Sequence, residues 1–576
     1  LQRLALNGQV VGEGGAGKPA DFVPADTPFT LAGSWRPVPM LVFNINGINA
    51  AYDDVQVTTR ALEKAEIARL SDIVHLPGVN ASLAVPESRF AADHLRPRFH
   101  AMPPANWTNE PHGLVVSGGR YHLFYQRTPN GPFKTQMHWG HMSSADLVNW
   151  THHRDALQPE LQTRDFGFDQ KGIWSGDVIV EGGKAFAYYT SVNHGPAYNP
   201  GISVAVSEDP GLRYWKKLGP VLDASNVQDF RDPYLWKENG VWHMIIGAAL
   251  KSGGGLDHYR CTVRNGKSCW ERVGDFSNVP YPKMDIGSAI WEMPVFEEIS
   301  GHRILLVNPI GGAVTKYGDM ATRGVYWLGN WENERFAPAT TRPRNLDLVP
   351  GHLSPAVARQ PDGTLAAIGI VDERRTPQAQ EDAGWAHTFS LPREWYLVAD
   401  GRALGQRPLR ALAGLREGPP KVFASASYRG ATLIADAGPQ AEFKVRFTPG
   451  QRGVFGIVLA ASPDGAEATR IVYDRANSRV VVDKSKSTLS AEMEGPAILQ
   501  GTYDESIYGE PADWHVFVDG SVVDVFIGNG AAFSFRVYPT RRDATGLGIF
   551  AEGAVTAEGV EVWTMKPMKI DYSFDD

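Results

Sequence analysis

The sequence predicts an all-β protein, namely a five-bladed β-propeller followed by a C-terminal β-sandwich and preceded by a small N-terminal β-rich domain. The first observation is a strand-turn-strand segment that recurs five times within residues 96–405, each time after a polar residue. The second is a series of long alternating strands after residue 405. A chain of 576 residues is also too long for one hydrophobic core. We therefore expect three domains, at residues 1–95, 96–405 and 406–576.

The N-terminal domain is predicted from short alternating segments such as residues 40–45 and 55–58, separated by loops rich in glycine and proline. Residues 61–70 are the one stretch with a helical pattern. No cluster of chemically active side chains occurs here, so a structural role and a sugar-binding role both remain open.

The propeller is predicted from the spacing of its repeats. The polar residues that open them stand at positions 110, 177, 232, 292 and 354, roughly 55 to 67 residues apart, which suits a blade of four short strands. In a propeller the first strand of each blade lines the central channel, so residues at these strand starts converge at one mouth. The sequence therefore predicts one pocket that holds Glu110, Asp177, Asp232 and Glu292.

Glu110 is the centre of this prediction. It stands between Asn109 and Pro111, before an apolar strand at 114–116, a Ser-Gly-Gly turn and an aromatic-rich strand at 121–125. A single Asn-Glu-Pro is usually an ordinary loop, and it is the recurrence of the arrangement that favours a functional interpretation.

Further polar and aromatic groups are expected at the same mouth. They are Gln126, Trp139, Trp174, Ser175 and Arg231. An Arg-Asp pair such as Arg231-Asp232 is often a structural ion pair, but beside two other acids we interpret it as a clamp on vicinal hydroxyls.

Metal binding is not expected. His138 and His141 are three residues apart on an extended strand, which turns them to opposite faces, so we interpret them as hydrogen-bonding or core groups. Cys261 and Cys269 flank an Asn-Gly turn and could face each other as a disulfide or stay as free thiols. Two thiols without a neighbouring ligand would leave a zinc shell incomplete.

The C-terminal sandwich is predicted from strands that carry no anchoring carboxylates. Residues 514–527 form the strongest hairpin signal, with alternating residues on both sides of Asp519-Gly520. We expect this domain to be structural.

Composition excludes several classes of protein. A formal net charge of −8 with both signs mixed along the chain provides no basic stripe for nucleic acid. No apolar run approaches the ~18 residues that span a bilayer, so no membrane segment is predicted. The chain opens at Leu1, and we expect that any export signal has been removed.

The predicted pocket suits glycoside hydrolysis, because one acid can protonate the leaving oxygen while another attacks the anomeric carbon or activates water. The sequence lacks the glycine-rich loop of nucleotide sites and the Gly-x-Ser-x-Gly turn of serine hydrolases.

Residues 106–113 resemble the Trp-Met-Asn-Asp-Pro-Asn-Gly motif of glycoside hydrolase family 32, the β-fructosidases. Five further segments resemble the later motifs of that family, in the same order. They are residues 124–126, 139–141, 174–176, 230–233 and 291–294. Residues 390–394 and the hairpin around Asp519 resemble the end of its propeller and its appended sandwich, so the resemblance covers residues 96–570.

The resemblance implies a residue for each role. Glu110 would be the nucleophile, Glu292 the acid/base, and Asp232 the transition-state stabiliser that binds fructose hydroxyls together with Arg231. The subsite for fructose would be lined by four residues, Asn109, Gln126, Trp139 and Ser175. The family is retaining, uses no cofactor or metal, and acts on fructofuranosides.

Two positions depart from the family motif. Glu110 replaces the Asp nucleophile and His112 replaces the Asn after the proline. The extra methylene of Glu110 moves the carboxylate by about 1.5 Å, and a misplacement near 1 Å can cost ~100-fold in rate unless the backbone compensates. The paired change favours a natural variant with an altered substrate or acceptor.

The sequence thus predicts a secreted or periplasmic retaining glycosidase that cleaves β-fructofuranosidic bonds in fructans, fructo-oligosaccharides or sucrose. Two alternatives stay open, a fructosyltransferase, including one that forms difructose anhydrides, and a fructan-binding protein with a degenerate site. Linkage preference, exo or endo action and oligomeric state do not follow from the sequence.

Overall fold

The computed structural model describes residues 2–6, 9–14, 39–40, 43–44, 62–71, 85, 87–129, 131–134, 136–159, 168–169, 172–192, 200–224, 227–261, 269–284, 287–311, 324–448 and 453–573. The chain divides into two compact units, residues 1–85 and 86–576. The larger unit thus starts ten residues before the predicted propeller domain, at residue 86. Residues 86–95 belong to the larger unit because they bond to it: Trp385 Nε1 donates to Asp93 Oδ2 at 2.7 Å, and Ser521 N donates to Leu95 O at 2.9 Å.

The smaller unit contains two short strand pairs and a helix among its described residues. Strand β1 (Gln2–Leu6) pairs antiparallel with β2 (Gln9–Gly14), and β3 (Pro39–Met40) pairs with β4 (Phe43–Asn44). Helix α1 (Lys64–Ser71) confirms the helical pattern of the sequence, shifted by a few residues. The segment expected as a strand at 55–58 lies outside the described residues.

The larger unit begins with a 3₁₀ helix, η1 (Glu87–Phe90), and then forms consecutive antiparallel sheets over its described residues 106–408. The first sheet is β5 (Asn106–Ser117), β6 (Arg120–Thr128), β7 (His138–Ser144) and β8 (Trp150–His153). The second is β9 (Gly172–Glu181), β10 (Lys184–Val192), β11 (Pro200–Ser207) and β12 (Lys216–Asp223). The third is β13 (Asp229–Glu238), β14 (Val241–Leu250), β15 (Gly253–Cys261) and β16 (Glu271–Asp275), followed by helix α2 (Tyr281–Met284).

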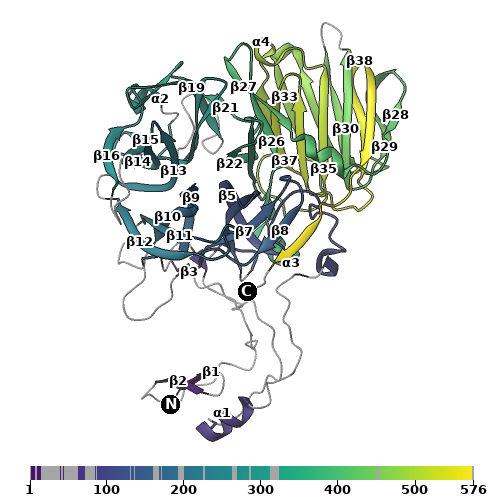
Figure 1. Cartoon of the computed structure of the whole chain (residues 1–576). Coiled ribbons are helices and arrows are strands. Elements are labelled where there is room, and N and C mark those ends of the chain that lie inside the picture. The colour runs from purple at the N-terminus through teal and green to yellow at the C-terminus, as the bar shows by residue number, and fades with distance from the viewer. Residues whose placement is uncertain are drawn as a thin grey trace. The chain divides into compact units, whose positions relative to one another are not determined.

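Two more sheets complete this region. One is β17 (Ile290–Ile299), β18 (His302–Ile310), β19 (Val325–Glu332), β20 (Arg335–Pro338) and β21 (Arg344–Asn345). The other is β22 (His352–Arg359), β23 (Leu365–Val371), β25 (Thr388–Phe389), β26 (Arg393–Val398) and β27 (Ala403–Pro408), with α3 (Pro377–Ala383) inserted. Strand β24 (Trp385–Ala386) runs parallel to β5 instead. The first strands β5, β9, β13, β17 and β22 are neighbours in that order, and β22 also neighbours β5, as propeller blades do (Figure 1).

A β-bulge interrupts each of these first strands. Two residues of the first strand oppose one residue of the second at positions 109–110, 174–175, 232–233, 293–294 and 354–355. Pro233, Pro294 and Pro355 occupy three of these bulges, which proline tolerates because no ladder hydrogen bond is needed there. A bulge bends the strand and re-aims its side chains, and bulges are common beside active sites. In the third, fourth and fifth repeats the X-Pro pair of the sequence coincides with the bulge.

The apolar core of this region lies between successive sheets. The third and fourth sheets, for example, enclose Trp236, Phe276 and Phe296, whose rings meet edge to face. Fully buried tryptophans stand at positions 139, 291, 327, 385, 395 and 514. Many of the aromatic residues therefore serve the β-core and not a sugar surface. Cys261 and Cys269 form a disulfide beside the third sheet, with 5.1 Å between the Cα atoms.

The C-terminal part is a two-layered, sandwich-like arrangement. After the 3₁₀ helix η2 (Arg410–Leu415) come β28 (Lys421–Phe423), β29 (Ala426–Asp436), β30 (Gln440–Thr448), β31 (Val454–Ala461), β32 (Ala468–Asp474), η3 (Arg475–Asn477), β33 (Arg479–Lys486), β34 (Ile498–Thr502), α4 (Glu505–Tyr508), β35 (Asp513–Asp519), β36 (Val522–Ile527), β37 (Ala531–Arg536) and β38 (Gly546–Thr564). Strand β38 pairs with β28, β29, β30 and β31, which joins the layers. The hairpin predicted around Asp519-Gly520 is confirmed as β35–β36.

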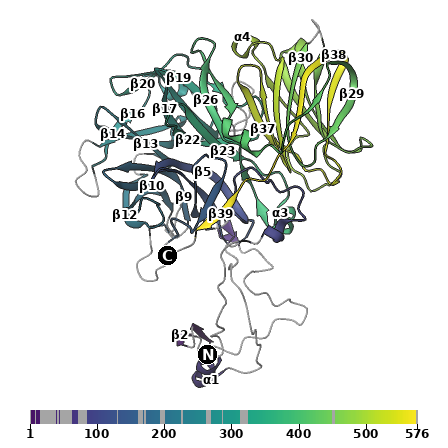
Figure 2. The same ribbon diagram turned by 45° about the vertical axis from the view of Figure 1, so that its right-hand side comes forward.

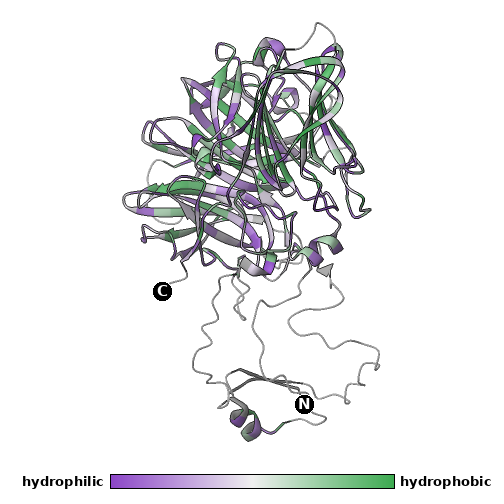
Figure 3. Cartoon of the chain, turned by 90° about the vertical axis from the view of Figure 1, so that its right-hand side faces the viewer, coloured by the Kyte–Doolittle hydropathy of each residue, from purple (hydrophilic) through white to green (hydrophobic). Residues whose placement is uncertain are grey.

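The final strand returns to the propeller sheets. Strand β39 (Ile570–Ser573) runs parallel to β8 and appears beside the first sheet in both ribbon views (Figures 1 and 2). Hydrophobic stretches alternate with hydrophilic ones along the strands (Figure 3). Within the described ranges, no helix has the length and apolarity that a membrane span requires.

Candidate active site

Three acids from three different first strands lie close enough for their charges to interact. Glu110 of β5 and Asp232 of β13 are only 8% and 3% exposed, and Glu292 comes from β17. Burial and the negative charge of Glu292 raise the pKa of Glu110 to about 7. Burial, and then the charges of Glu110 and Glu292, raise the pKa of Asp232 well above its ordinary value. The pocket therefore holds carboxylates that repel one another and keep a proton near neutral pH.

Hydrogen-bond donors from three sheets hold the carboxylate of Glu110. Ser175 Oγ donates to Oε2 at 2.8 Å, and Gln126 Nε2 donates to the same oxygen at 3.2 Å. Ser354 Oγ donates to Oε1 at 3.3 Å. Gln126 is itself held by Asn109, whose Nδ2 donates to Gln126 Oε1 at 3.2 Å. These bonds orient Glu110 and favour its ionised form, although burial outweighs them.

Arg231 forms ion pairs with two carboxylates at the mouth. Its Nε donates to Glu292 Oε1 at 2.8 Å and its Nη1 to Asp229 Oδ2 at 2.6 Å. The guanidinium carbon also lies 5.8 Å from the ring centroid of Trp174. Arg231 thus orients Glu292, and the predicted clamp of Arg231 and Asp232 on vicinal hydroxyls stays a prediction.

Asp232 is held by its backbone as much as by its side chain. It adopts a left-handed φ of 63° in the bulge of β13, a conformation that aspartate tolerates better than most residues. Its N–H donates to Thr190 Oγ1 at 2.8 Å, while its Oδ2 accepts a bond from Met293 N at 3.1 Å. Thr190 in turn donates to the carbonyl of Ser175 at 3.1 Å, so one hydroxyl links two bulges.

Two further residues predicted to bind substrate, Trp139 and Asp177, are held by contacts with the backbone. Trp139 is fully buried, and its Nε1 donates to the carbonyl of Trp174 at 2.8 Å, so it supports the segment that carries Ser175. Asp177 lines, together with Asp232, a small cavity of about 30 Å³ between the first strands, and its Oδ2 accepts a bond from Leu235 N at 2.9 Å. Burial raises its pKa to about 7. The bulge in β9 falls at Trp174 and Ser175, so these two residues stand at the mouth and Asp177 lies deeper.

Sequence reasoning missed several residues of the pocket. The sequence predicts Ser354 only as a repeat position, and Asp229 and Thr190 belong to no motif. Lys134 carries no signal either, yet its positive charge lowers the pKa of Glu110 against the effect of burial. Within the described ranges, no group of three or more His, Cys, Asp or Glu side chains is arranged to hold a metal ion.

Comparison with known families supports this geometry. Residues 100–408 match the model of the glycosyl hydrolases family 32 N-terminal domain, and residues 413–564 match that of the family 32 C-terminal domain. The chain belongs to glycoside hydrolase family 32. It is therefore a glycosidase, and the propeller sheets and the sandwich correspond to the two family domains.

Individual family 32 proteins are similar over most of the chain. A sucrose-6-phosphate hydrolase of Zymomonas mobilis subsp. mobilis is 27% identical over 508 residues, which is 83% of this chain and 94% of that protein. A levanase of Bacillus subtilis is 28% identical over 83% of this chain and 72% of its own. The solved structure of a Bombyx mori GH32 β-fructofuranosidase covers 82% of this chain and 94% of its own, with 26% identity and a TM-score of 0.67.

Proposed function

We propose that this family 32 enzyme is a retaining β-fructofuranosidase that cleaves fructose-containing oligo- or polysaccharides. The observation that carries the proposal is Glu110, a buried carboxylate oriented by donors on both of its oxygens and placed in one pocket with Glu292 and Asp232. The names of the relatives, which include a levanase and a β-fructofuranosidase, support a fructose-containing substrate.

In the proposed reaction, Glu110 attacks the anomeric carbon of the fructosyl unit while Glu292 donates a proton to the departing oxygen. The glycosidic bond breaks and an ester bond to Glu110 forms. Glu292 then removes a proton from water, which attacks the same carbon and releases fructose and free Glu110. Asp232 stabilises the oxocarbenium-like transition state and, with Arg231, binds hydroxyls. Asn109 and Trp174, both partly exposed, are proposed to contact the sugar.

Three further features are part of the proposal. The consecutive sheets of residues 106–408 are proposed to be the five blades of one propeller, in line with the neighbouring order of their first strands. Hydrolysis is proposed to need no cofactor or metal. The protein is proposed to work outside the cytoplasm, supported by the disulfide between Cys261 and Cys269, a bond that oxidising compartments favour.

Product analysis with sucrose, inulin and levan tests the proposal. We expect free fructose whose first-formed anomer, followed by NMR, has the configuration of the substrate. Longer oligomers or difructose anhydrides as the main products would show a transferase, and binding without turnover would show a degenerate site. The opposite anomer would show inversion, which requires carboxyl groups ~6.5 to 9.5 Å apart and not the ~5 to 5.5 Å of a retaining pair.

Glu292→Gln separates the two carboxyl roles within this assay. The variant should lose roughly 10²- to 10⁴-fold on sucrose but much less on a fructoside with an acidic aryl leaving group, because that group departs without a proton. An equal loss on both substrates would argue against Glu292 as the acid.

A further inference from the structure

The backbone around Glu110 is interrupted by two bulges on the same strand. Asn109 and Glu110 together oppose one residue of β6, and residues 113–114 do so again four positions later. Pro111, between the bulges, has no N–H to contribute to the ladder. The backbone that carries Glu110 therefore lacks regular ladder support on both sides and needs support from side chains.

His112 provides such support. Its Nδ1 lies 3.1 Å from the carbonyl oxygen of Glu110, and because a carbonyl only accepts, Nδ1 carries the hydrogen. The side chain is 2% exposed, and burial lowers its pKa to about 3. His112 is therefore neutral at working pH, and its one N–H, at Nδ1, is engaged by the carbonyl of Glu110.

The ring of His112 also contacts the support of the Glu110 carboxylate. Its centroid lies 4.3 Å from that of Trp139, whose Nε1 donates to the carbonyl of Trp174 at 2.8 Å. The next residue, Ser175, donates to Glu110 Oε2 at 2.8 Å. His112 thus holds the backbone of Glu110 directly and touches, through Trp139, the segment that holds its carboxylate.

We infer that His112 is a positioning residue whose Nδ1–H fixes the bulge that carries Glu110, so that the long glutamate side chain meets Ser175, Gln126 and Ser354. The inference rests on the proposed function, in which Glu110 is the nucleophile. It assigns His112 a role without contact to substrate and without proton transfer. The essential element is a donor attached to Cγ, and the ring is secondary.

Two substitutions at His112 separate a donor from a ring. His112→Asn keeps a donor, because Asn Nδ2 is attached to Cγ as His Nδ1 is, but it loses the ring that packs on Trp139. His112→Phe keeps a ring of similar size and loses the donor. A positioning role predicts that Asn is the faster variant, whereas a packing role predicts that Phe is.

We expect kcat of His112→Phe on sucrose to fall roughly 10- to 100-fold, as a misplacement near 1 Å does, with KM within about 3-fold. His112→Asn should recover most of this loss and stay within about 5-fold of the parent kcat. The apparent pKa values of the pH–rate profile should be the same in His112→Asn and the parent, because His112 does not titrate in the working range.

His122 offers a matched control on the same strand pair. It is also 2% exposed, its pKa is also lowered by burial, to about 4, and its Nε2 donates to a carbonyl of β5, that of Ser117 at 3.2 Å. His122→Phe should lower thermal stability at least as much as His112→Phe while kcat stays within about 3-fold, since Ser117 is at the far end of β5.

The inference is overturned if His112→Phe is at least as fast as His112→Asn, or if His122→Phe lowers kcat as much as His112→Phe. A Glu110→Gln variant, measured in parallel, keeps this failure distinct from failure of the proposed function. Should Glu110→Gln be active, Glu110 is not the nucleophile; should it be inactive while His112→Phe keeps parental kcat, only the role of His112 is wrong.

Discussion

The pocket at the propeller mouth and the contact between the propeller sheets and the sandwich both bury charged side chains, but they balance them differently. At the mouth, three acids face each other and the pKa values of Glu110 and Asp232 are raised. At the sandwich contact, Arg393 is fully buried, and its Nη1 donates to Asp347 Oδ1 at 2.6 Å, which holds the pKa of that carboxyl well below its usual range despite burial.

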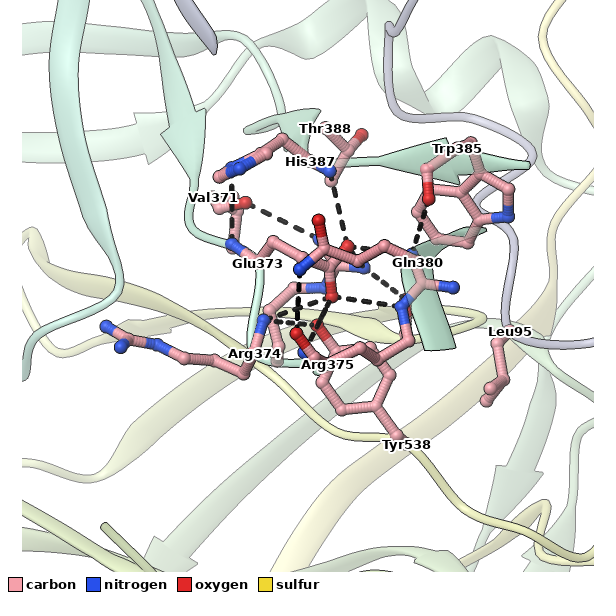
Figure 4. Close-up of polar contacts among 12 residues, drawn as sticks. Leu95, Val371, Glu373, Arg374, Arg375, Gln380, Trp385, His387, Thr388 and Tyr538 are labelled. Carbon is pink, nitrogen blue, oxygen red and sulfur yellow. Dashed lines mark hydrogen bonds and ion pairs between the residues drawn. The ribbon is translucent and has the colours of Figure 1, made fainter. Parts of the chain in front are cut away.

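The network around Glu373, also at the sandwich contact, balances its buried acid with arginine as the Asp347 pair does (Figure 4). Arg375 Nη2 donates to Glu373 Oε2 at 2.7 Å, and the hydroxyl of Tyr538, from the sandwich, donates to the other oxygen. Burial alone would raise the pKa of Glu373, but Arg536 and Arg375 lower it well below its usual value. Arginine side chains thus neutralise the buried acids of the sandwich contact. The acids of the mouth are only partly neutralised, so the pKa values of Glu110 and Asp232 stay raised, as is common for acids at functional sites.

Glu110→Gln should produce the largest change in activity, and it tests the comparison by removing one of the uncompensated acids at the mouth. We expect kcat on sucrose to fall by roughly 10⁴-fold or more, because the amide cannot form the ester intermediate. Stability should stay equal or rise, because a buried carboxylate with raised pKa is removed. Steady-state kinetics and thermal unfolding measure both effects, and a variant with substantial activity would contradict the assigned role.

Glu373→Gln should, in contrast to Glu110→Gln, lower stability and leave activity unchanged. It leaves Arg375 and Arg536 without their buried counter-charge, so the free energy of unfolding should fall by about 3 to 5 kcal/mol. The kcat of the folded fraction should stay near the parental value.

The exposed pair of Arg260 and Glu334 is the control for Glu373→Gln. Glu334→Gln should cost less than about 1 kcal/mol in a denaturant titration. If both substitutions had equal effects, the sandwich contact would not depend on its buried charges.

The pH dependence of stability also differs between the two regions, beginning with His100 at the sandwich contact. Burial by itself would lower the pKa of His100, but hydrogen bonds to Asp519 and Asp524 raise it to about 9, above the unfolded value of 6.5. Its contribution is therefore fully present below pH 6.5 and is lost as pH rises through 9, by roughly 3 kcal/mol.

Glu110 gives a stability slope of the same sign in a lower pH range, but for a different reason, because here burial and a like charge disfavour the ionised form. Its pKa is raised from 4.5 to about 7, so ionisation between those values should reduce stability as pH rises. Unfolding titrations from pH 5 to 10 on the parent, His100→Asn and Glu110→Gln test both slopes. A parent-to-His100→Asn difference that stays constant across pH 6 to 10 would contradict the role of His100.

Deletion of residues 1–85 should have the smallest effect. These residues form a compact unit of their own, and every described group of the pocket comes from residues 109–354. Turnover of sucrose should stay within a few-fold of the parent. A still-folded deletion that loses activity on short and long substrates alike would show that this unit helps to build the pocket.

Much of the fold could be predicted from local patterns. The strand-turn-strand repeats, the Asp519-Gly520 hairpin and the helix near residues 61–70 follow from periodicity and turn chemistry, which act over a few residues. The start of the larger unit did not follow, because residues 86–95 are held by Trp385 and Ser521, which are hundreds of positions away.

The sequence by itself predicted that four acids at repeat positions lie together, and three of them, Glu110, Asp232 and Glu292, are close enough for their charges to interact. Only the tertiary structure decided how each is held. Ser354 reaches Glu110 across 244 positions, Trp139 is fully buried, and Asp177 accepts a bond from Leu235 N of the neighbouring first strand. Strand periodicity is local and survives in the sequence, whereas the burial and charge that set a pKa depend on neighbours that only the folded chain brings together.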